Sequence, residues 1–151
     1  MKKPIIFSII VIFILSVVIV GILGVKMGSG EEIIYVTKIT CTNLILGADT
    51  IPALPTTVEN TFQSVVEYEK NIKFALNYQV APDNATYKGA AFTSSNENWY
   101  TINDFGIVSF TEEFHENIAS KGTITKILIK PTITSTDGHA IKATYNVVVK
   151  F

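Results

Sequence analysis

The chain begins with an uncharged apolar segment, and no other feature constrains its fold as strongly. Residues 4–25 include 17 Ile, Val, Leu or Phe residues among 22 and carry no charged side chain. A helix of this length extends about 33 Å, which is enough to cross a hydrocarbon core of about 30 Å. The sequence therefore predicts a transmembrane helix over residues 4–25, in contact with the lipid bilayer, and a water-exposed part after it.

The charges around this segment predict its orientation. Lys2 and Lys3 precede the apolar run, whereas only Lys26 follows it closely. The positive-inside rule then makes residues 1–3 a cytoplasmic tail and places the carboxyl-terminal part outside the cell, as in a single-pass protein of the cell membrane. Secretion after cleavage of a signal peptide is the alternative. The apolar run is longer than a signal peptide needs and lacks an Ala-x-Ala cleavage site, which favours an uncleaved signal anchor.

The remaining sequence predicts one external domain after a short linker. Residues 26–32 contain Gly28 and Gly30 and are expected to be the flexible linker, and residues 33–151 the domain. The chain has 12 lysines, no arginine and a net charge of −1, so a nucleic-acid partner is not expected. Its one cysteine, Cys41, excludes a disulfide within the chain and is expected to be a buried thiol on a strand. An intermolecular disulfide is the alternative.

Short runs of β-branched and aromatic residues, separated by turn residues, predict an all-β domain. The expected strands are residues 33–43, 62–69, 72–80, 89–93, 99–102, 107–110, 123–134 and 140–151. Gly106 and the Asp137-Gly138 pair are expected in tight turns. Residues 44–60, with two prolines, predict a long connection or an interrupted edge strand, and residues 111–121 predict a solvated loop. A helix over residues 58–68 is the alternative to the second strand, but its β-branched and aromatic residues favour the strand, so no helix is expected after the membrane segment.

Several stretches resemble the bacterial immunoglobulin-like domains of the Big2 type. Residues 78–86, 92–96 and 102–108 resemble that family's Pro-x-Asn-Ala-Thr turn, its following strand and its Val-Asp-x-x-Gly-x-Val hairpin. Residues 122–127 (Gly-Thr-Ile-Thr-Lys-Ile) resemble its Gly-Thr-Ala-x-Ile strand, and residues 135–149 its closing hairpin. The resemblance runs from about Val65 to Val149.

The resemblance implies an immunoglobulin-like antiparallel β-sandwich of the kind found in adhesins and cell-wall proteins. It carries no catalytic residues. Phe92 stands where the family commonly has Trp, and residues 44–60 and 111–121 are longer than the family's connections. These two segments are where this chain departs from the family.

The sequence offers little to support catalysis or metal binding. Glu112 and His115 have a spacing that could supply two metal ligands from a helix, but the second set that such a site needs is missing. The other histidine, His139, lies far along the chain, and no Gly-x-Ser-x-Gly motif occurs. We therefore expect no enzyme activity, no metal and no cofactor.

The residues most typical of a recognition patch are Trp99 and Tyr100, which follow a polar turn. They are the candidate contacts for a surface polysaccharide or protein ligand, and the alternative is that one of them packs inward. The expected function is that of a non-catalytic, membrane-anchored extracellular module for surface binding or adhesion. A structural or assembly component of the cell envelope, packed against a partner membrane or surface protein, is the alternative.

Overall fold

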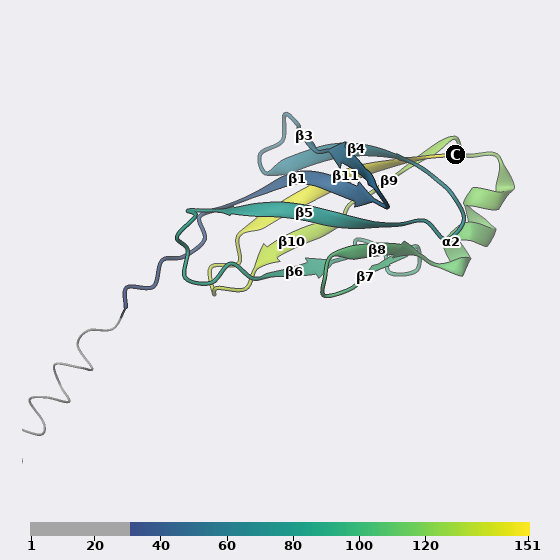
Figure 1. Ribbon diagram of the computed structural model, residues 1–151. Coiled ribbons are helices and arrows are strands. Elements are labelled where there is room, and N and C mark those ends of the chain that lie inside the picture. Colours follow the sequence, from purple (N-terminus) through teal and green to yellow (C-terminus); the bar gives the residue numbers. More distant parts are fainter. Residues whose placement is uncertain (1–30) are drawn as a thin grey trace, which may run out of the picture. The chain divides into compact units, whose positions relative to one another are not determined.

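The computed structural model describes residues 31–151, and about half of these residues form the strands of two β-sheets that make a β-sandwich (Figure 1). The predicted all-β class is confirmed for this part of the chain. The predicted membrane helix, residues 4–25, lies outside the described residues. Within residues 31–151, no helix has the length and apolar character needed to cross a membrane.

Five antiparallel strands make the first sheet, sheet A. Their order across the sheet is β2 (Asp49–Pro52), β1 (Lys38–Leu46), β5 (Lys73–Ala81), β8 (Ile107–Phe110) and β7 (Tyr100–Ile102). A tight turn joins β7 to β8, and Gly106 within it has a φ of 74°, a conformation that glycine adopts without strain. The predicted turn at Gly106 is therefore confirmed.

The second sheet, sheet B, has one parallel pair at its centre. Its order is β3 (Leu54–Pro55), β4 (Thr61–Glu67), β11 (Lys142–Lys150), β10 (Thr132–Ser135) and β6 (Ala90–Thr93). Strand β9 (Lys126–Ile129) also pairs with β11, along residues 147–150, whereas β10 pairs with residues 142–144. Strands β4 and β11 run parallel, and the other pairs are antiparallel.

Alternating side chains from both sheets fill the core. In β11 the side chains of Ala143, Tyr145, Val147 and Val149 are all buried, as the period of two of a half-buried strand requires. This bears out the predicted strand over residues 140–151. In the same way, β5 buries Phe74 and Leu76.

The structure corrects three predicted elements. The first strand begins at Lys38 rather than at residue 33. The expected strand over residues 123–134 is divided into β9 and β10 by Lys130 and Pro131, because proline lacks the amide hydrogen that a regular ladder uses. The expectation of a solvated loop over residues 111–121, with no helix, was wrong, since that segment contains helix α2 (Glu112–Asn117) and the 3₁₀ helix η1 (Ala119–Lys121).

Helix α2 forms because it is capped at its start and packed on the sandwich. The hydroxyl of Thr111 accepts a hydrogen bond from the Phe114 amide at 3.2 Å, and Glu112 and Glu113 occupy the first turn, where negative charge is favoured. Phe114 is fully buried and its ring stacks on Phe110 at 4.6 Å. This packing supplies the stability that so short a helix lacks in isolation.

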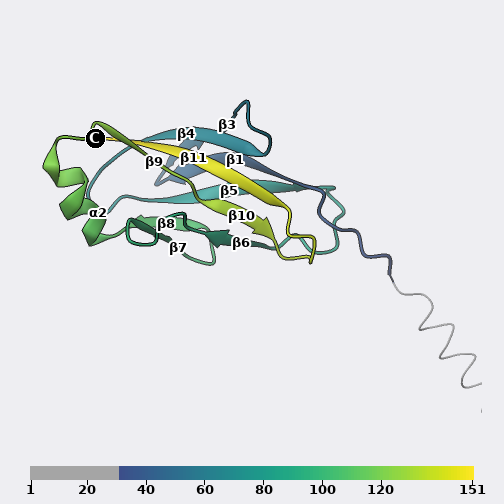
Figure 2. The ribbon, with the colours of Figure 1, turned by 180° about the vertical axis from the view of Figure 1, so that it is seen from behind.

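The chain enters the sandwich at the end opposite to α2 and the carboxyl terminus (Figures 1 and 2). Ile34 exchanges two hydrogen bonds with Thr86, its amide donating to the Thr86 hydroxyl at 2.9 Å and its carbonyl accepting from the Thr86 amide at 2.8 Å. The Val36 amide donates to the Asp137 carboxylate at 2.5 Å. Hydrogen bonds from two different loops thus hold the start of the folded unit.

Candidate functional site

The two residues predicted to contact a ligand, Trp99 and Tyr100, both pack against the sandwich. Tyr100 is fully buried, and its hydroxyl lies 2.9 Å from both the amide nitrogen and the hydroxyl of Ser95. Trp99 is half-buried and its ring meets Phe114 edge-on at 6.2 Å. The pair therefore offers a ligand at most the exposed part of the Trp99 ring.

The two histidines lie apart and each is engaged by a tyrosine. His115 Nδ1 is 3.1 Å from the Tyr68 hydroxyl, and the pKa of Tyr68 is raised by burial and by the charge of Glu112. His139 stacks on Tyr35 with ring centroids 3.9 Å apart. No group of three or more His, Cys, Asp or Glu side chains that could hold a metal ion occurs among residues 31–151.

Cys41 is a buried thiol on β1, as predicted. Its side chain is 2% exposed. Burial raises the pKa of the thiol to about 12, and a hydrogen bond with Tyr145 opposes that rise in part. Because the thiolate is the reactive form, this cysteine has little nucleophilic character at neutral pH.

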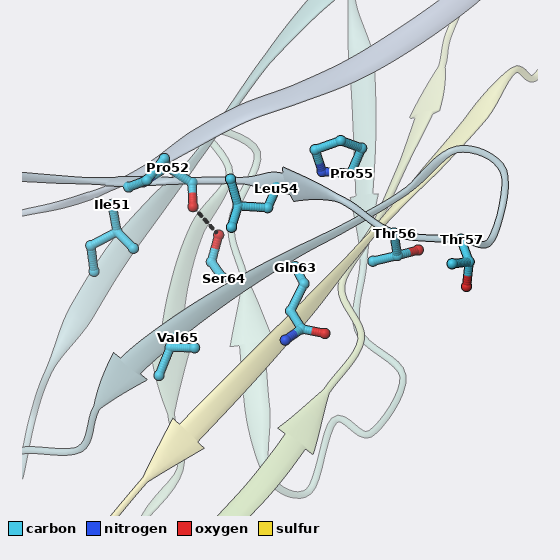
Figure 3. Close-up of a pocket in the computed structure, with 9 residues that line it drawn as sticks. All are labelled: Ile51, Pro52, Leu54, Pro55, Thr56, Thr57, Gln63, Ser64 and Val65. Atoms are coloured by element: carbon cyan, nitrogen blue, oxygen red, sulfur yellow. Dashed lines mark hydrogen bonds between the residues drawn. The ribbon is translucent and has the colours of Figure 1, made fainter.

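The most distinctive surface feature lies where the chain crosses from one sheet to the other. The Ala53 amide donates to the Thr42 carbonyl of β1 at 3.0 Å, whereas the next residue, Leu54, pairs with Gln63 of β4. On the other side of Ala53, the Pro52 carbonyl accepts a hydrogen bond from the Ser64 hydroxyl at 3.0 Å (Figure 3). The crossover is thus fixed to both sheets.

Beside this crossover lies an apolar groove with a volume of about 510 Å³ (Figure 3). Its apolar side chains include Ile51, Leu54 and Val65, and its polar side chains are uncharged. Leu54 is 63% exposed and Val65 is 38% exposed. A concave apolar surface with a few uncharged polar groups is typical of a binding site.

The groove adjoins an open edge of sheet B. The Thr61 carbonyl accepts from the Thr56 amide on the β3 side, whereas the Tyr68 amide donates to Lys150 of β11. Since backbone groups alternate in direction along a strand, the amides and carbonyls of Val65 and Glu67 also face away from β11. Among the described residues, β3 pairs with Phe62 and Gln63 only and no strand continues the pairing to Val65.

Pro52 explains why the edge stays open. In the register of β3 with β4, the position opposite Val65 belongs to Pro52, which has no amide hydrogen to donate. Its carbonyl is already engaged by Ser64. The chain therefore leaves sheet B at this point, and the backbone groups of Val65 remain available.

Apolar side chains continue from the groove across the outer face of sheet B. Val65 lies opposite Val148, and Val148 lies opposite Leu128, which is 42% exposed. Adjacent side chains at matched register contact one another across strands. The groove is therefore one end of an apolar row that spans β4, β11 and β9.

A second cavity, of about 690 Å³, shares Pro55 and Thr56 with the groove. It is lined largely by polar side chains of residues 37–42 and 56–61. Both hollows thus draw part of their lining from residues 44–60, for which the sequence predicted a long connection or an interrupted edge strand. The sequence signal for this site was Leu54, an apolar residue between Pro52 and Pro55, where a solvated loop would carry a polar one.

A scan of the chain against protein-family models finds no match, and a search among curated proteins finds no relative.

Proposed function

We propose that this chain is a non-catalytic, membrane-anchored extracellular module with an immunoglobulin-like fold of the Big2 type, and that it binds a protein ligand through the groove between β3 and β4. The observation that carries this proposal is the exposed apolar groove beside an open sheet edge. Exposing Leu54 and Val65 to water costs free energy that burial under a ligand would recover, at roughly 25 cal/mol for each Å².

The order of the strands supports the immunoglobulin-like part of the proposal. In this comparison, β1 and β4 count as two halves of a divided first strand, and β9 and β10 count together as the sixth strand. The strands β5, β6, β7 and β8 are then the second, third, fourth and fifth, and β11 is the seventh. Sheet A then has the order first, second, fifth, fourth, and sheet B contains the third, sixth and seventh. This is the ABED and CFG arrangement of an immunoglobulin domain. The segment between β1 and β4 is the insertion.

The lining of the groove favours a protein over a polysaccharide. Its polar groups are threonine and serine hydroxyls and one amide, from Gln63, and none of its lining residues is aromatic or charged. A sugar chain would therefore find few hydrogen-bonding partners and no ring on which to stack. An apolar peptide side chain would find the contact surface that it needs.

Anchorage is supported by the sequence of residues 4–25 and is tested directly. Intact cells are treated with protease and the domain is followed with an antibody raised against it. Loss of the domain, with a membrane-bound stub left behind, supports an external anchored module. Protection of the domain in cells freed of their wall contradicts the external location. Recovery of a shortened protein from the medium supports secretion in place of anchorage.

The apolar row on sheet B favours one alternative function. A permanent neighbour in the envelope would cover Val65, Val148 and Leu128 together, as obligate interfaces cover apolar surface. The chain would then be a structural or assembly component. Purification of the full chain from solubilised membranes distinguishes the two, because a structural component brings its partner in fixed stoichiometry whereas a surface receptor is recovered without one.

A further inference from the structure

We propose that the ligand of this groove is an extended peptide segment of a partner protein, bound as an added strand beside β4. The inference rests on the proposed binding function and names the chemistry of the ligand. Strand addition of this kind draws affinity from main-chain hydrogen bonds and specificity from pockets for alternate side chains.

The open edge of β4 matches the backbone of an extended peptide. Val65 and Glu67 each present one amide and one carbonyl along the edge, spaced as in any strand. Only another extended backbone offers acceptors and donors at the same spacing. The residue of the chain itself that would come opposite Val65 is Pro52, which has no amide hydrogen to donate and whose carbonyl is bound by Ser64. The backbone groups of Val65 are therefore left for a segment of another protein.

The groove lies beside that edge, where it can receive side chains of an added strand. Side chains alternate along a strand, so every second side chain of an added peptide would lie on the outer face of sheet B. Leu54 and Val65 already lie on that side and line the groove. An apolar residue of the peptide at this position would be buried against them. Charged peptide residues gain nothing there, because the lining is uncharged.

Strand β9 forms another edge of sheet B, and it differs from the β4 edge in its charged side chains. The Phe151 amide donates to the Thr125 carbonyl, so the backbone groups of Lys126 and Leu128 in β9 face away from β11. Lys126 and Lys130 flank Leu128 on this edge, and lysines on edge strands oppose pairing with other chains. Strand β4 contains no lysine. The one charged residue of β4, Glu67, has its carboxylate 3.8 Å from the Lys150 ammonium of the neighbouring strand β11. The β9 edge thus carries two lysines that oppose strand addition, whereas the β4 edge beside Val65 carries none.

The test selects peptides on the full chain embedded in lipid nanodiscs. Phage-displayed random dodecapeptides are selected against the wild-type chain and depleted on the Leu54→Ser variant. Selected peptides are then synthesised and their affinities measured by fluorescence anisotropy. We expect apolar residues at alternate positions and affinity about tenfold weaker for Leu54→Ser. The matched control, Leu128→Ser on the β9 edge, should change the affinity by less than about twofold.

N-methylation of the peptides tests the backbone hydrogen bonds. Methyl groups on the amides that face β4 should weaken binding at least about tenfold, whereas methyl groups on the intervening amides should have little effect. Hydrogen exchange of the Val65 amide in the wild-type chain provides a second measurement that needs no variant, and peptide binding should slow it. Equal effects of both methylation patterns, or unchanged exchange at Val65, would overturn strand addition.

The outcomes separate this inference from the proposed function. If peptides bind the groove but both methylation patterns weaken their binding equally, the chain is a protein-binding module that does not bind by strand addition. Failure to select any peptide that distinguishes wild type from Leu54→Ser would overturn the strand-addition inference, and the cell-surface location would still be decided by protease treatment. An internal location of the domain would overturn the proposed function even if peptides bind in vitro.

Discussion

The hydroxyl of Tyr145 donates a hydrogen bond to the main-chain carbonyl of Asn43 at 3.0 Å and so joins β11 of one sheet to β1 of the other through the core. The same hydroxyl also contacts the Asn77 carbonyl of β5. The register of β1 with β5 shifts between Cys41 and Asn43, which marks a β-bulge. Tyr145 therefore supplies a donor at the place where the regular ladder of sheet A is interrupted.

Tyr145→Phe should destabilise the domain by about 1–3 kcal/mol, because it leaves the part-buried Asn43 carbonyl without its donor while keeping the ring. Urea denaturation followed by the fluorescence of Trp99, the only tryptophan, measures this change in the free energy of unfolding. Tyr87→Phe is the matched control, since Tyr87 is 57% exposed, and it should stay within about 0.5 kcal/mol of wild type. Equal effects of the two variants would contradict a structural role for the Tyr145 hydroxyl.

The contact of Asp137 with Val36 should make stability depend on acid pH. Burial alone would raise the pKa of Asp137, but hydrogen bonds from the Val36 amide, the Ser135 hydroxyl and the His139 amide, with the charge of His139, together lower it. A carboxyl group whose pKa is lower in the folded state stabilises the fold above its unfolded pKa, about 3.9. That contribution is lost as the pH falls through the folded pKa.

Asp137→Ala should therefore lower Tm at neutral pH, and the difference from wild type should shrink as the pH falls below about pH 4. Thermal unfolding at a series of pH values measures both curves. Asp104→Ala, in the exposed turn between β7 and β8, is the control and should have a small effect throughout. A difference that did not shrink below about pH 4 would contradict the assigned role of Asp137.

Phe114→Ala should remove the contact that holds α2 on the sandwich. Phe114 is fully buried among Phe110, Trp99 and Phe151, so its truncation should cost about 3–5 kcal/mol. Denaturant unfolding measures the loss, and Trp99 fluorescence of the folded variant should report the altered packing. Phe105→Ala is the matched control because Phe105 is 83% exposed, and its effect should be close to zero. If Phe114→Ala had equally little effect, the helix would be held by other contacts.

Local patterns predicted the strands whose own side chains alternate clearly. The alternation of residues 72–80 and 140–151 found β5 and β11, and Gly106 marked the turn between β7 and β8. These features depend on side-chain period and on backbone conformation, which are properties of the local sequence. The segment before Lys38 is rich in β-branched residues but lies at the end of the sandwich, so composition alone placed the start of the first strand too early.

The features that sequence reasoning missed depend on contacts between distant residues or on weak local signals. Thr111 followed by Glu112 and Glu113 is an N-terminal helix signal, but the helix also needs Phe114 to reach a core that only the folded sandwich provides. Pro131 was visible within the predicted strand and is the signal for its division. The groove depends on Ala53 bonding to one sheet and Leu54 to the other, which no local pattern encodes.

The Cys41 thiol should be unreactive in the folded protein and should react like any exposed cysteine thiol in the unfolded one. Its thiol is 2% exposed and its pKa is raised to about 12, so both access and the thiolate fraction at pH 8 are low. Iodoacetamide should leave the native chain unmodified over a time in which the urea-unfolded chain is fully alkylated, as followed by intact mass. The chain should also migrate as a monomer on a non-reducing gel. Rapid alkylation under native conditions, or a disulfide-linked dimer, would mean that β1 opens far enough for the thiol to leave the core.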